Sequence, residues 1–432
     1  MKAKQKKQKS QIGEIANARI LSGVKVLDLT RYLSGPQATL FLADLGADVV
    51  RVDDPKRVDP AASAPPFFGP KGVSLTKQTD EDLGIAYLKR GRGKKSITID
   101  LKSDDGLMLF KQLASKADVI VENFRVGVTK RLGVNYEALK EVNPGLIYCS
   151  ITGFGNDGPE RDRKAYDLMV QASSGIMSVT GDPDGLAYKT GSPISDGVSG
   201  TFAVLGILGA LFHRTKTGMG QFIDVSMTDC LTALMYDEPW DCYNDLGLPV
   251  RQGNRIMRFS PFNTYKAANG VVALGAATDA DWINLLTLMG REELKLDDNF
   301  MNPGWRIVNN TKVDSIVAEW TEKLPVENIV ERCAQQSIPC SPVRSVSDLQ
   351  SWPQLKQRNL LQSVTHPQLP KATGPLGASF PLKFSFADTT NNIPAAGHGE
   401  HTASVIKHWL GKDADLGHPI QPIRRDSDRD KR

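Results

Sequence analysis

The stretch "GVKVLDLTRYLSGPQATLFLADLGADVVRVDDP", Gly23–Pro55, decides the fold. Residues 25–30 form an apolar run typical of a strand, and residues 35–47 carry apolar side chains at helical spacing. Residues 48–55 indicate a second strand, which Pro55 closes. A strand, a helix and a strand within about thirty residues predict one parallel crossover unit.

The same alternation continues along the first half of the chain. Strand-like runs occupy residues 95–101, 118–124 and 145–155, with helical patterns at 106–117 and 136–143. This alternation predicts an α/β fold, a doubly wound parallel sheet with helices on both faces. Ligands bind beyond the carboxyl ends of such strands. Residues 60–89 are rich in Pro, Gly and polar residues and predict a long surface loop.

The pattern changes after a last strand at residues 220–227. An Asn269–Gly270 turn predicts a hairpin, and residues 279–290 and 313–324 have the spacing of amphipathic helices. We therefore predict a large domain, a smaller α+β domain, a return segment to the large domain and two disordered charged tails. Their ranges are 21–225, 226–335, 336–420, and 1–20 with 421–432.

Composition narrows the classes of function. Among 432 residues, 40% are hydrophobic and 24% charged, which is ordinary for a globular protein, and the net charge of +4 does not indicate a nucleic-acid partner. Five scattered cysteines without a C-x-x-C pair favour a reducing compartment, so we expect a cytoplasmic protein. No apolar run has the length of a membrane span. No histidine precedes His213, and we predict no metal site.

The motif "GFGNDG", residues 153–158, formally fits the dinucleotide fingerprint G-x-G-x-x-G. That fingerprint requires a helix directly after it, to hold a pyrophosphate at the helix N-terminus. The following residues, "PERDRKAYD", are charged and lack apolar spacing. A glycine-rich loop that lets a ligand approach the backbone is favoured over a nicotinamide oxidoreductase.

Polar and aromatic residues follow the strand at 118–124. Asn123, Phe124 and Arg131 suit a ligand that has a ring and phosphate groups, although a solvated helix start with a core Phe explains them as well. Arg51, Lys94 and Lys95 lie at or near other strand ends and would extend this site as one positive rim. Each of these cations alone is ordinary surface charge.

Asp196 lies in "SPISDGVSG", residues 192–200, just ahead of an apolar helical run. One interpretation is a helix cap. The other is a nucleophile, because a carboxylate is already ionised at neutral pH and can attack a thioester without a general base. The residues alone favour the cap.

The order of several motifs resembles the family III CoA-transferases, the group of formyl-CoA and carnitine CoA-transferases. The resemblance rests on Gly23–Pro55 together with "ADVIVENFRVGVTKRLG", "LIYCSITGFGNDGP", "AYDLMVQASSG" and "HRTKTGMGQFIDVSMTD", and it covers nearly the whole chain. The family pattern D-x-x-x-Q-A-x-[ST]-G matches Asp167 and Gln171–Gly175. The resemblance therefore implies that Asp167 is the nucleophile and that Asp196 is a cap or pocket residue. It also implies CoA binding by Asn123, Phe124 and Arg131.

The resemblance further implies an interlocked homodimer, each chain with a Rossmann-like large domain and a small domain. The implied reaction is ping-pong transfer of CoA through aspartyl anhydride and aspartyl-CoA thioester intermediates. It needs no permanently bound cofactor, since the coenzyme A thioester is a substrate.

For substrates we expect succinyl-CoA and a dicarboxylic acid. Leu33 stands where formyl-CoA transferases have Gln, which argues against oxalate and formate. Arg251 and Arg255 are candidates for binding the second carboxylate of the acceptor, with a solvated linker as the alternative, and Tyr166 is a candidate for the substrate pocket.

A 2-methylacyl-CoA racemase is the closest rival to this function. Racemisation needs an acid or base on each face of the substrate, and the absence of an early histidine favours transfer. A CoA-binding regulatory protein is a further alternative.

Overall fold

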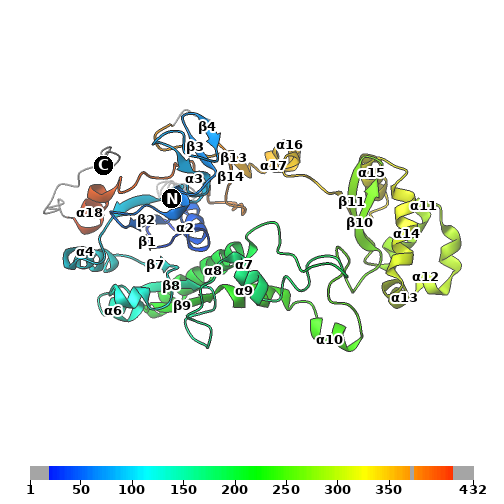
Figure 1. Cartoon of the computed structure of the whole chain (residues 1–432), viewed down its shortest axis with the longest axis horizontal. Coiled ribbons are helices and arrows are strands. Elements are labelled where there is room, and N and C mark those ends of the chain that lie inside the picture. The colour runs from blue at the N-terminus through cyan, green and yellow to red at the C-terminus, as the bar shows by residue number, and fades with distance from the viewer. Residues whose placement is uncertain (1–18, 370–373, 412–432) are drawn as a thin grey trace, which may run out of the picture. The chain divides into compact units, whose positions relative to one another are not determined.

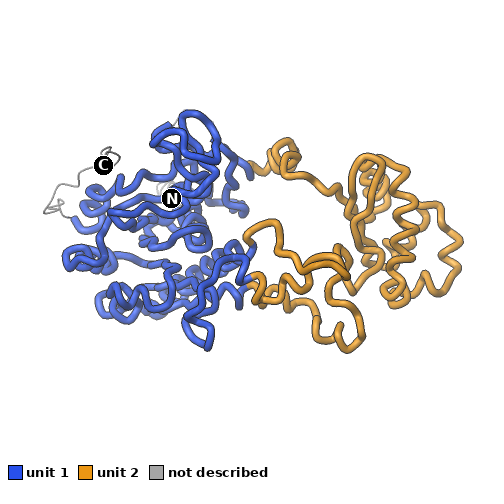
Figure 2. Tube along the Cα trace, viewed as in Figure 1, with its two compact units in different colours: residues 1–170, 194–230, 360–432 blue, residues 171–193, 231–359 orange. Residues whose placement is uncertain are grey.

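The structure is a computed structural model that describes residues 19–369 and 374–411. Residues 1–18 and 412–432, which hold most of the two predicted charged tails, lie outside the described residues. The chain divides into two compact units (Figure 2). Within the described residues, unit 1 takes 19–170, 194–230 and 360–411, and unit 2 takes 171–193 and 231–359. The domain limits drawn from sequence stay a prediction.

A six-stranded parallel sheet forms the centre of unit 1 (Figure 1). Its strands are β1 (Lys25–Asp28), β2 (Asp48–Asp53), β6 (Lys95–Thr98), β7 (Val119–Glu122), β8 (Ile147–Thr152) and β9 (Gln221–Ser226). They lie in the order β6-β2-β1-β7-β8-β9, and every neighbouring pair is parallel. The predicted parallel sheet is confirmed. The order reverses between β1 and β7, the position where doubly wound folds bind ligands.

Helices cover both faces of this sheet. On one face, α2 (Ser34–Asp44) packs against α8 (Ile194–Thr217), which also contacts β8 and β9. On the other face, α4 (Asp104–Ala114), α6 (Tyr136–Lys140) and α18 (Thr402–Leu410) share a core with the strands that includes Phe110, Leu139 and Trp409. Among the described helices, only α8 has the length and hydropathy of a membrane span. In this structure it packs against α2 and against the strands β8 and β9.

The prediction of a surface loop at residues 60–89 is wrong. This segment forms η1 (Pro60–Ala62), the strands β3 (Phe67–Gly69), β4 (Gly72–Ser74) and β5 (Leu83–Gly84), and helix α3 (Ile85–Arg90). The strands make a small sheet in the order β4-β3-β5. Phe68 and Leu88 are buried in a core that also contains Val364 and Ala395. Distant apolar residues thus cover a segment whose own composition is typical of a loop.

Unit 2 has its own core. The strands β10 (Phe262–Ala267) and β11 (Gly270–Gly275) form the predicted hairpin, and β12 (Cys340–Pro342) extends it. Trp282 is buried among side chains of the sheet and of the helices that pack on it. The helices of this unit are α10 (Trp240–Asp245), α11 (Asp279–Met289), α12 (Asp298–Met301), α13 (Pro303–Val308), α14 (Asn310–Thr321), α15 (Val326–Gln335), α16 (Asp348–Ser351) and α17 (Pro353–Gln357).

Candidate active site

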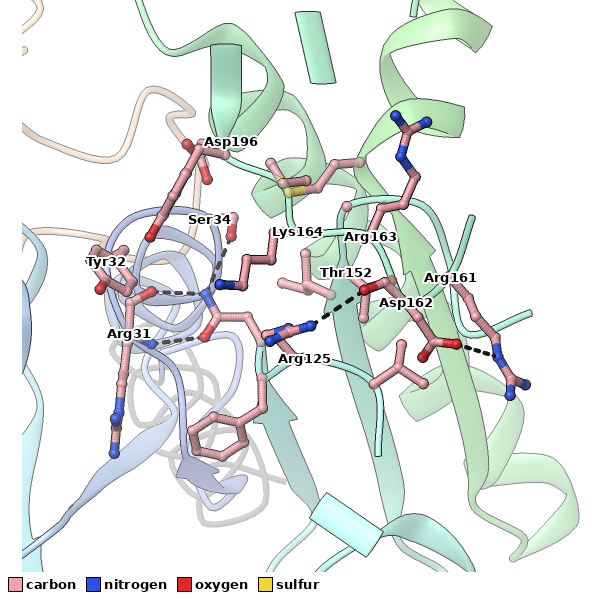
Figure 3. Close-up of a pocket in the computed structure, with 18 residues that line it drawn as sticks. Arg31, Tyr32, Ser34, Arg125, Thr152, Arg161, Asp162, Arg163, Lys164 and Asp196 are labelled. Carbon is pink, nitrogen blue, oxygen red and sulfur yellow. Dashed lines mark hydrogen bonds and ion pairs between the residues drawn. The ribbon is translucent and has the colours of Figure 1, made fainter. Parts of the chain in front are cut away.

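A cavity of about 480 Å³ opens at the carboxyl ends of the central strands of unit 1. Its walls come from the loop between β1 and α2, the residues after β7, and the segment after β8. Figure 3 shows Tyr32, Ser34 and Asp196 at one end of the cavity and Arg161 and Arg163 at the other. The cavity therefore lies at the switch point of the sheet.

Asn123 joins the two loops that meet at this switch point. Its Oδ1 accepts a hydrogen bond from the Arg31 backbone N–H at 2.8 Å, and its Nδ2 donates to the Arg31 backbone oxygen at 2.8 Å. The Arg31 guanidinium lies over the ring of Phe124, 5.4 Å from the centroid. Asn123 thus fixes the loop after β1, and Phe124 presents a ring to the cavity.

Cations dominate the lining of the cavity. It includes five positive side chains and two carboxylates, Asp162 and Asp196; the cations are Arg31, Arg125, Arg161, Arg163 and Lys164. Arg163 pairs with Glu160 at 2.6 Å and Arg161 with Asp162 at 3.5 Å. Such a lining suits a ligand with several phosphate groups.

Asp167 is half-buried and begins α7 (Asp167–Ser173), one residue after the cavity-lining Tyr166. Its Oδ1 accepts hydrogen bonds from the Ser195 hydroxyl at 2.5 Å and from the Ser195 backbone N–H at 2.9 Å. The backbone N–H of Asp196 lies 3.5 Å from the same oxygen. The first turn of α8 therefore holds the Asp167 carboxylate in one orientation.

Asp196 is the third residue of α8 and lines the cavity, so it is a pocket residue rather than the cap of that helix. Burial raises the pKa of Asp196 to about 6, and the nearby Asp167 adds to this effect. Hydrogen bonds from the Ser34 side chain and backbone oppose the rise. Asp196 therefore gains or loses its negative charge near neutral pH, close to the Asp167 carboxylate.

Tyr32 and Tyr166 meet at the same end of the cavity. Their rings pack edge to face, with centroids 6.2 Å apart. Tyr32 has a backbone φ of 67°, a left-handed conformation that is uncommon for a bulky residue and often marks a functional site. Burial and the neighbouring Tyr166 raise the pKa of Tyr32, so its hydroxyl stays neutral.

Residues 21–402 match the family described as CoA-transferase family III. The chain belongs to this family. The succinate–glutarate CoA-transferase of Agrobacterium fabrum is 33% identical to it over 388 residues, which cover 89% of this chain and 94% of the relative. The succinyl-CoA:mesaconate CoA-transferase of Haloarcula hispanica is 34% identical over 351 residues, which cover 80% of this chain and 86% of the relative.

A solved structure supports the same assignment for this CoA-transferase. The CAIB/BAIF family protein from Brucella suis aligns with a TM-score of 0.76 at 34% identity, over 90% of this chain and 99% of the other. The protein is therefore a CoA-transferase with a mixed α/β fold, and the resemblance inferred from its motifs is confirmed.

The glycine-rich loop of this CoA-transferase does not form a dinucleotide site. No helix begins after Gly153–Gly158 until Asp167. Instead, Asn156 ties the loop to Asp224, with its backbone N–H 2.9 Å from Oδ2 and its Nδ2 2.8 Å from Oδ1. The loop forms one wall of the cavity through Gly153.

The cations of the predicted positive rim, Arg51, Lys94 and Lys95, are not among the residues that line this cavity. Arg51 is buried within β2, where it binds Asp53 at 2.8 Å and the Tyr87 hydroxyl at 2.7 Å. Lys95 is the first residue of β6 and pairs with Asp48, the first residue of β2, at 2.7 Å. Because the strands are parallel, Lys95 lies at the amino end of the sheet, opposite the cavity.

Three further arginines named from sequence also lie outside the cavity lining. Arg131 is exposed at the end of α5 (Val128–Arg131). In unit 2, Arg251 donates to the backbone oxygens of Asp182 at 2.8 Å and of Gly185 at 2.6 Å. Arg255 pairs with Asp314 at 2.7 Å. Both unit 2 guanidinium groups therefore have protein partners.

Sequence reasoning missed Arg31, Tyr32, Lys164 and Ser195. The first two follow the strand β1, so the rule that ligands bind at carboxyl strand ends points to them. Lys164 lies in the irregular segment before α7 and Ser195 in the first turn of α8, and no local pattern distinguishes them. Among the described residues, no group of His, Cys, Asp and Glu is arranged to hold a metal ion.

Proposed function

We propose that this CoA-transferase moves coenzyme A from succinyl-CoA to a dicarboxylic acid through covalent intermediates on Asp167. The names of both relatives refer to dicarboxylates, and one names succinyl-CoA as the donor. The observation that carries the proposal is the position of Asp167, a carboxylate held by Ser195 beside a cavity lined by cations.

The chemistry follows from carboxylate nucleophilicity. Asp167 attacks the thioester carbonyl of succinyl-CoA and expels the CoA thiolate, which leaves an aspartyl–succinyl anhydride. The thiolate then attacks the Asp167 carbonyl, releases succinate and forms an aspartyl-CoA thioester. The acceptor carboxylate repeats these two exchanges in reverse order. Each step replaces one activated carbonyl with another, so no ATP is consumed.

The cavity lining supports the binding of CoA in an orientation that brings its thioester to Asp167. We expect Arg31, Arg125 and Lys164, which line the cavity, to contact phosphates, and Phe124 to make apolar contact with the ligand. Asn123 contributes to ligand binding indirectly, because it holds the loop that carries Arg31. We retain Arg131 as a CoA contact on the family resemblance, and coenzyme A enters as substrate rather than as a resident cofactor.

We also propose an interlocked homodimer that consists of a Rossmann-like large domain and a small domain in each chain. Exposed apolar side chains on α8, among them Leu205 and Phe212, support an interface on that helix. A cytoplasmic location is supported by the cysteines, since Cys149, Cys230, Cys242, Cys333 and Cys340 are all free thiols.

The direct test is to trap the intermediate. The protein is incubated with succinyl-CoA alone and reduced with borohydride, and the peptide that holds Asp167 is analysed by mass spectrometry. We expect reduction of the Asp167 carboxyl in the wild type and none in Asp167→Asn. Modification at Asp196 instead, or no modification with succinyl-CoA or acetyl-CoA, would contradict the proposal.

The racemase alternative has its own readout. A racemase exchanges the α-proton of its acyl-CoA, which requires an acid or base on each face. No histidine occurs among the described residues that line the cavity. We therefore expect no deuterium incorporation at the α-carbon of a 2-methylacyl-CoA incubated in heavy water. Incorporation of deuterium in the absence of an acceptor acid would show that the enzyme is a racemase rather than a transferase.

A further inference from the structure

Ser195 is a fully buried serine whose two donors converge on one oxygen of Asp167. Its hydroxyl lies 2.5 Å and its backbone N–H 2.9 Å from Oδ1, and the Asp196 N–H adds a longer approach at 3.5 Å. The hydroxyl is also 3.2 Å from the Asp167 backbone oxygen. Because a hydroxyl has one proton, the shorter contact to Oδ1 takes it.

We propose that Ser195, together with the first turn of α8, is an oxyanion-binding site for the enzyme's own acyl carbonyl. This role rests on the proposed function, because it requires Asp167 to be the residue that becomes acylated. It makes Ser195 a catalytic residue, since its donors contact an atom that changes charge during the reaction.

The chemistry creates a need for such a site. When the CoA thiolate attacks the anhydride at Cγ of Asp167, the sulfur–carbon bond forms and the carbonyl π electrons move onto the oxygen that is not in the anhydride bridge. The resulting oxyanion collapses, the bridging C–O bond breaks, and the succinate carboxylate leaves. Attack of the acceptor carboxylate on the aspartyl-CoA thioester builds charge on the same oxygen. Half of the tetrahedral intermediates are therefore centred on the protein.

The geometry places the donors where that charge develops. If Oδ1 is the non-bridging oxygen, the hydrogen bonds that hold the ionised carboxylate are the ones that meet the oxyanion. Two of the three donors are backbone N–H groups of a 24-residue helix, whose N-terminus carries partial positive charge. Preorganised donors of this kind need no rearrangement at the moment of reaction.

Ser195 lies close to a second buried serine on the same helix. Its own backbone oxygen accepts a hydrogen bond from the hydroxyl of Ser199 at 2.8 Å, one helical turn further along α8. Ser199 is equally buried but does not approach Asp167 in the hydrogen bonds of the described residues. It therefore provides a matched control with the same side chain, the same helix and the same burial.

The test measures formation of the aspartyl-CoA thioester in a single turnover with succinyl-CoA and no acceptor. In Ser195→Ala we expect the rate constant to fall by about 10²- to 10³-fold, the usual effect of removing one oxyanion donor. The dissociation constant for succinyl-CoA should stay within about threefold. Ser199→Ala should lose thermal stability without slowing thioester formation by more than about threefold.

Two further variants keep the test valid if Ser195→Ala is poorly folded. Ser195→Cys nearly preserves volume but offers a weak S–H donor, so it should be as slow as Ser195→Ala. Ser195→Thr restores a hydroxyl and should recover part of the rate. Thioester formation at the wild-type rate in Ser195→Ala or Ser195→Cys would overturn the inference. Absence of any thioester in the wild type would instead overturn the proposed function itself.

Discussion

The backbone N–H of Asp196 lies 3.5 Å from Oδ1 of Asp167, so two carboxylates meet at the N-terminus of one helix. Burial is the main reason why the pKa of Asp196 is raised to about 6, and the charge of Asp167 is the second. The helix dipole and the Ser34 hydrogen bonds make the ionised form tolerable. The net charge beside the proposed nucleophile therefore depends on pH.

This relationship predicts a pH dependence of acceptor use. Once ionised, Asp196 repels an incoming acceptor carboxylate, so kcat/KM for the acceptor should fall as pH rises through the pKa of Asp196 in the aspartyl-CoA enzyme. In that form Asp167 is uncharged, and burial alone raises the pKa of Asp196 above its ordinary value. In Asp196→Asn the charge is absent, and this inflection should disappear. Steady-state kinetics at saturating donor, across the range from about pH 5 to pH 8, measure the effect.

The variant also controls for the substrate. A phosphate monoester such as the one in coenzyme A titrates near pH 6 as well, and that titration is the same for both proteins. An inflection that persists unchanged in Asp196→Asn belongs to the substrate and would refute the role of Asp196.

The same pKa predicts a stability effect. The pKa of Asp196 is higher in the folded protein than in the unfolded chain, so its stabilising contribution is complete below about pH 4 and is lost as pH rises through about 6. Asp196→Asn avoids this loss. Its free energy of unfolding relative to wild type should therefore increase over this window, by at most about 3 kcal/mol. Urea unfolding at several pH values gives this difference, and a constant difference would contradict the prediction.

The unpaired cations of the cavity predict the affinity for acyl-CoA. Within the described residues, Arg31 and Lys164 have no ion pair, whereas Arg163 is paired with Glu160. Replacing Arg31 or Lys164 with Ala should raise the donor KM by about 10- to 100-fold, because a charge-assisted hydrogen bond to phosphate contributes about 1.5–3 kcal/mol. The effect should shrink at high salt.

Lys95 is the matched control for these cations. It forms an ion pair with Asp48 at the opposite edge of the sheet, so Lys95→Ala should change the donor KM by less than about twofold. An equal rise in KM for Lys95→Ala and Lys164→Ala would show that overall charge, rather than the cavity, attracts the donor.

Local patterns were enough to predict the sheet, because each crossover unit is contained in a short stretch such as Gly23–Pro55. They failed for residues 60–89, where burial depends on partners far along the chain. Phe68 becomes a core residue only because Val364 and Ala395 pack against the same cluster. Composition cannot reveal such a distant contact.

The candidate site could likewise be predicted from the sequence only in part. Asn123 and Phe124 were predicted because they directly follow a strand that ends at the switch point. Arg51 and Lys95 do not line the cavity, because position near a strand end does not tell which edge of the sheet a side chain reaches, or whether it is buried. Ser195 could not be found, since its importance depends on a contact with Asp167 across 28 residues.

Arg255 offers a prediction that separates binding from stability. Its partner Asp314 also accepts hydrogen bonds from the Tyr265 hydroxyl at 2.6 Å and from Asn263 at 2.9 Å. Arg255→Ala leaves this buried carboxylate without its cation, so the melting temperature should fall, with a loss of about 1–3 kcal/mol. The sequence suggested acceptor binding instead, and a rise in acceptor KM without a rise in donor KM would restore that role.

Lys94 provides the strongest stability prediction. Its ammonium group is fully buried and donates to Asp28 at 3.0 Å, to the Pro36 backbone oxygen at 2.8 Å and to Thr39 at 2.6 Å. Lys94→Met should cost about 3–5 kcal/mol, because the buried Asp28 carboxylate then has no cation. Adding Asp28→Asn should recover part of this loss, since it removes the uncompensated charge.

Lys95→Met is the control for this prediction. It breaks a half-exposed ion pair and should cost less than about 1 kcal/mol. Equal losses for Lys94→Met and Lys95→Met in urea unfolding would refute this account of the buried pair.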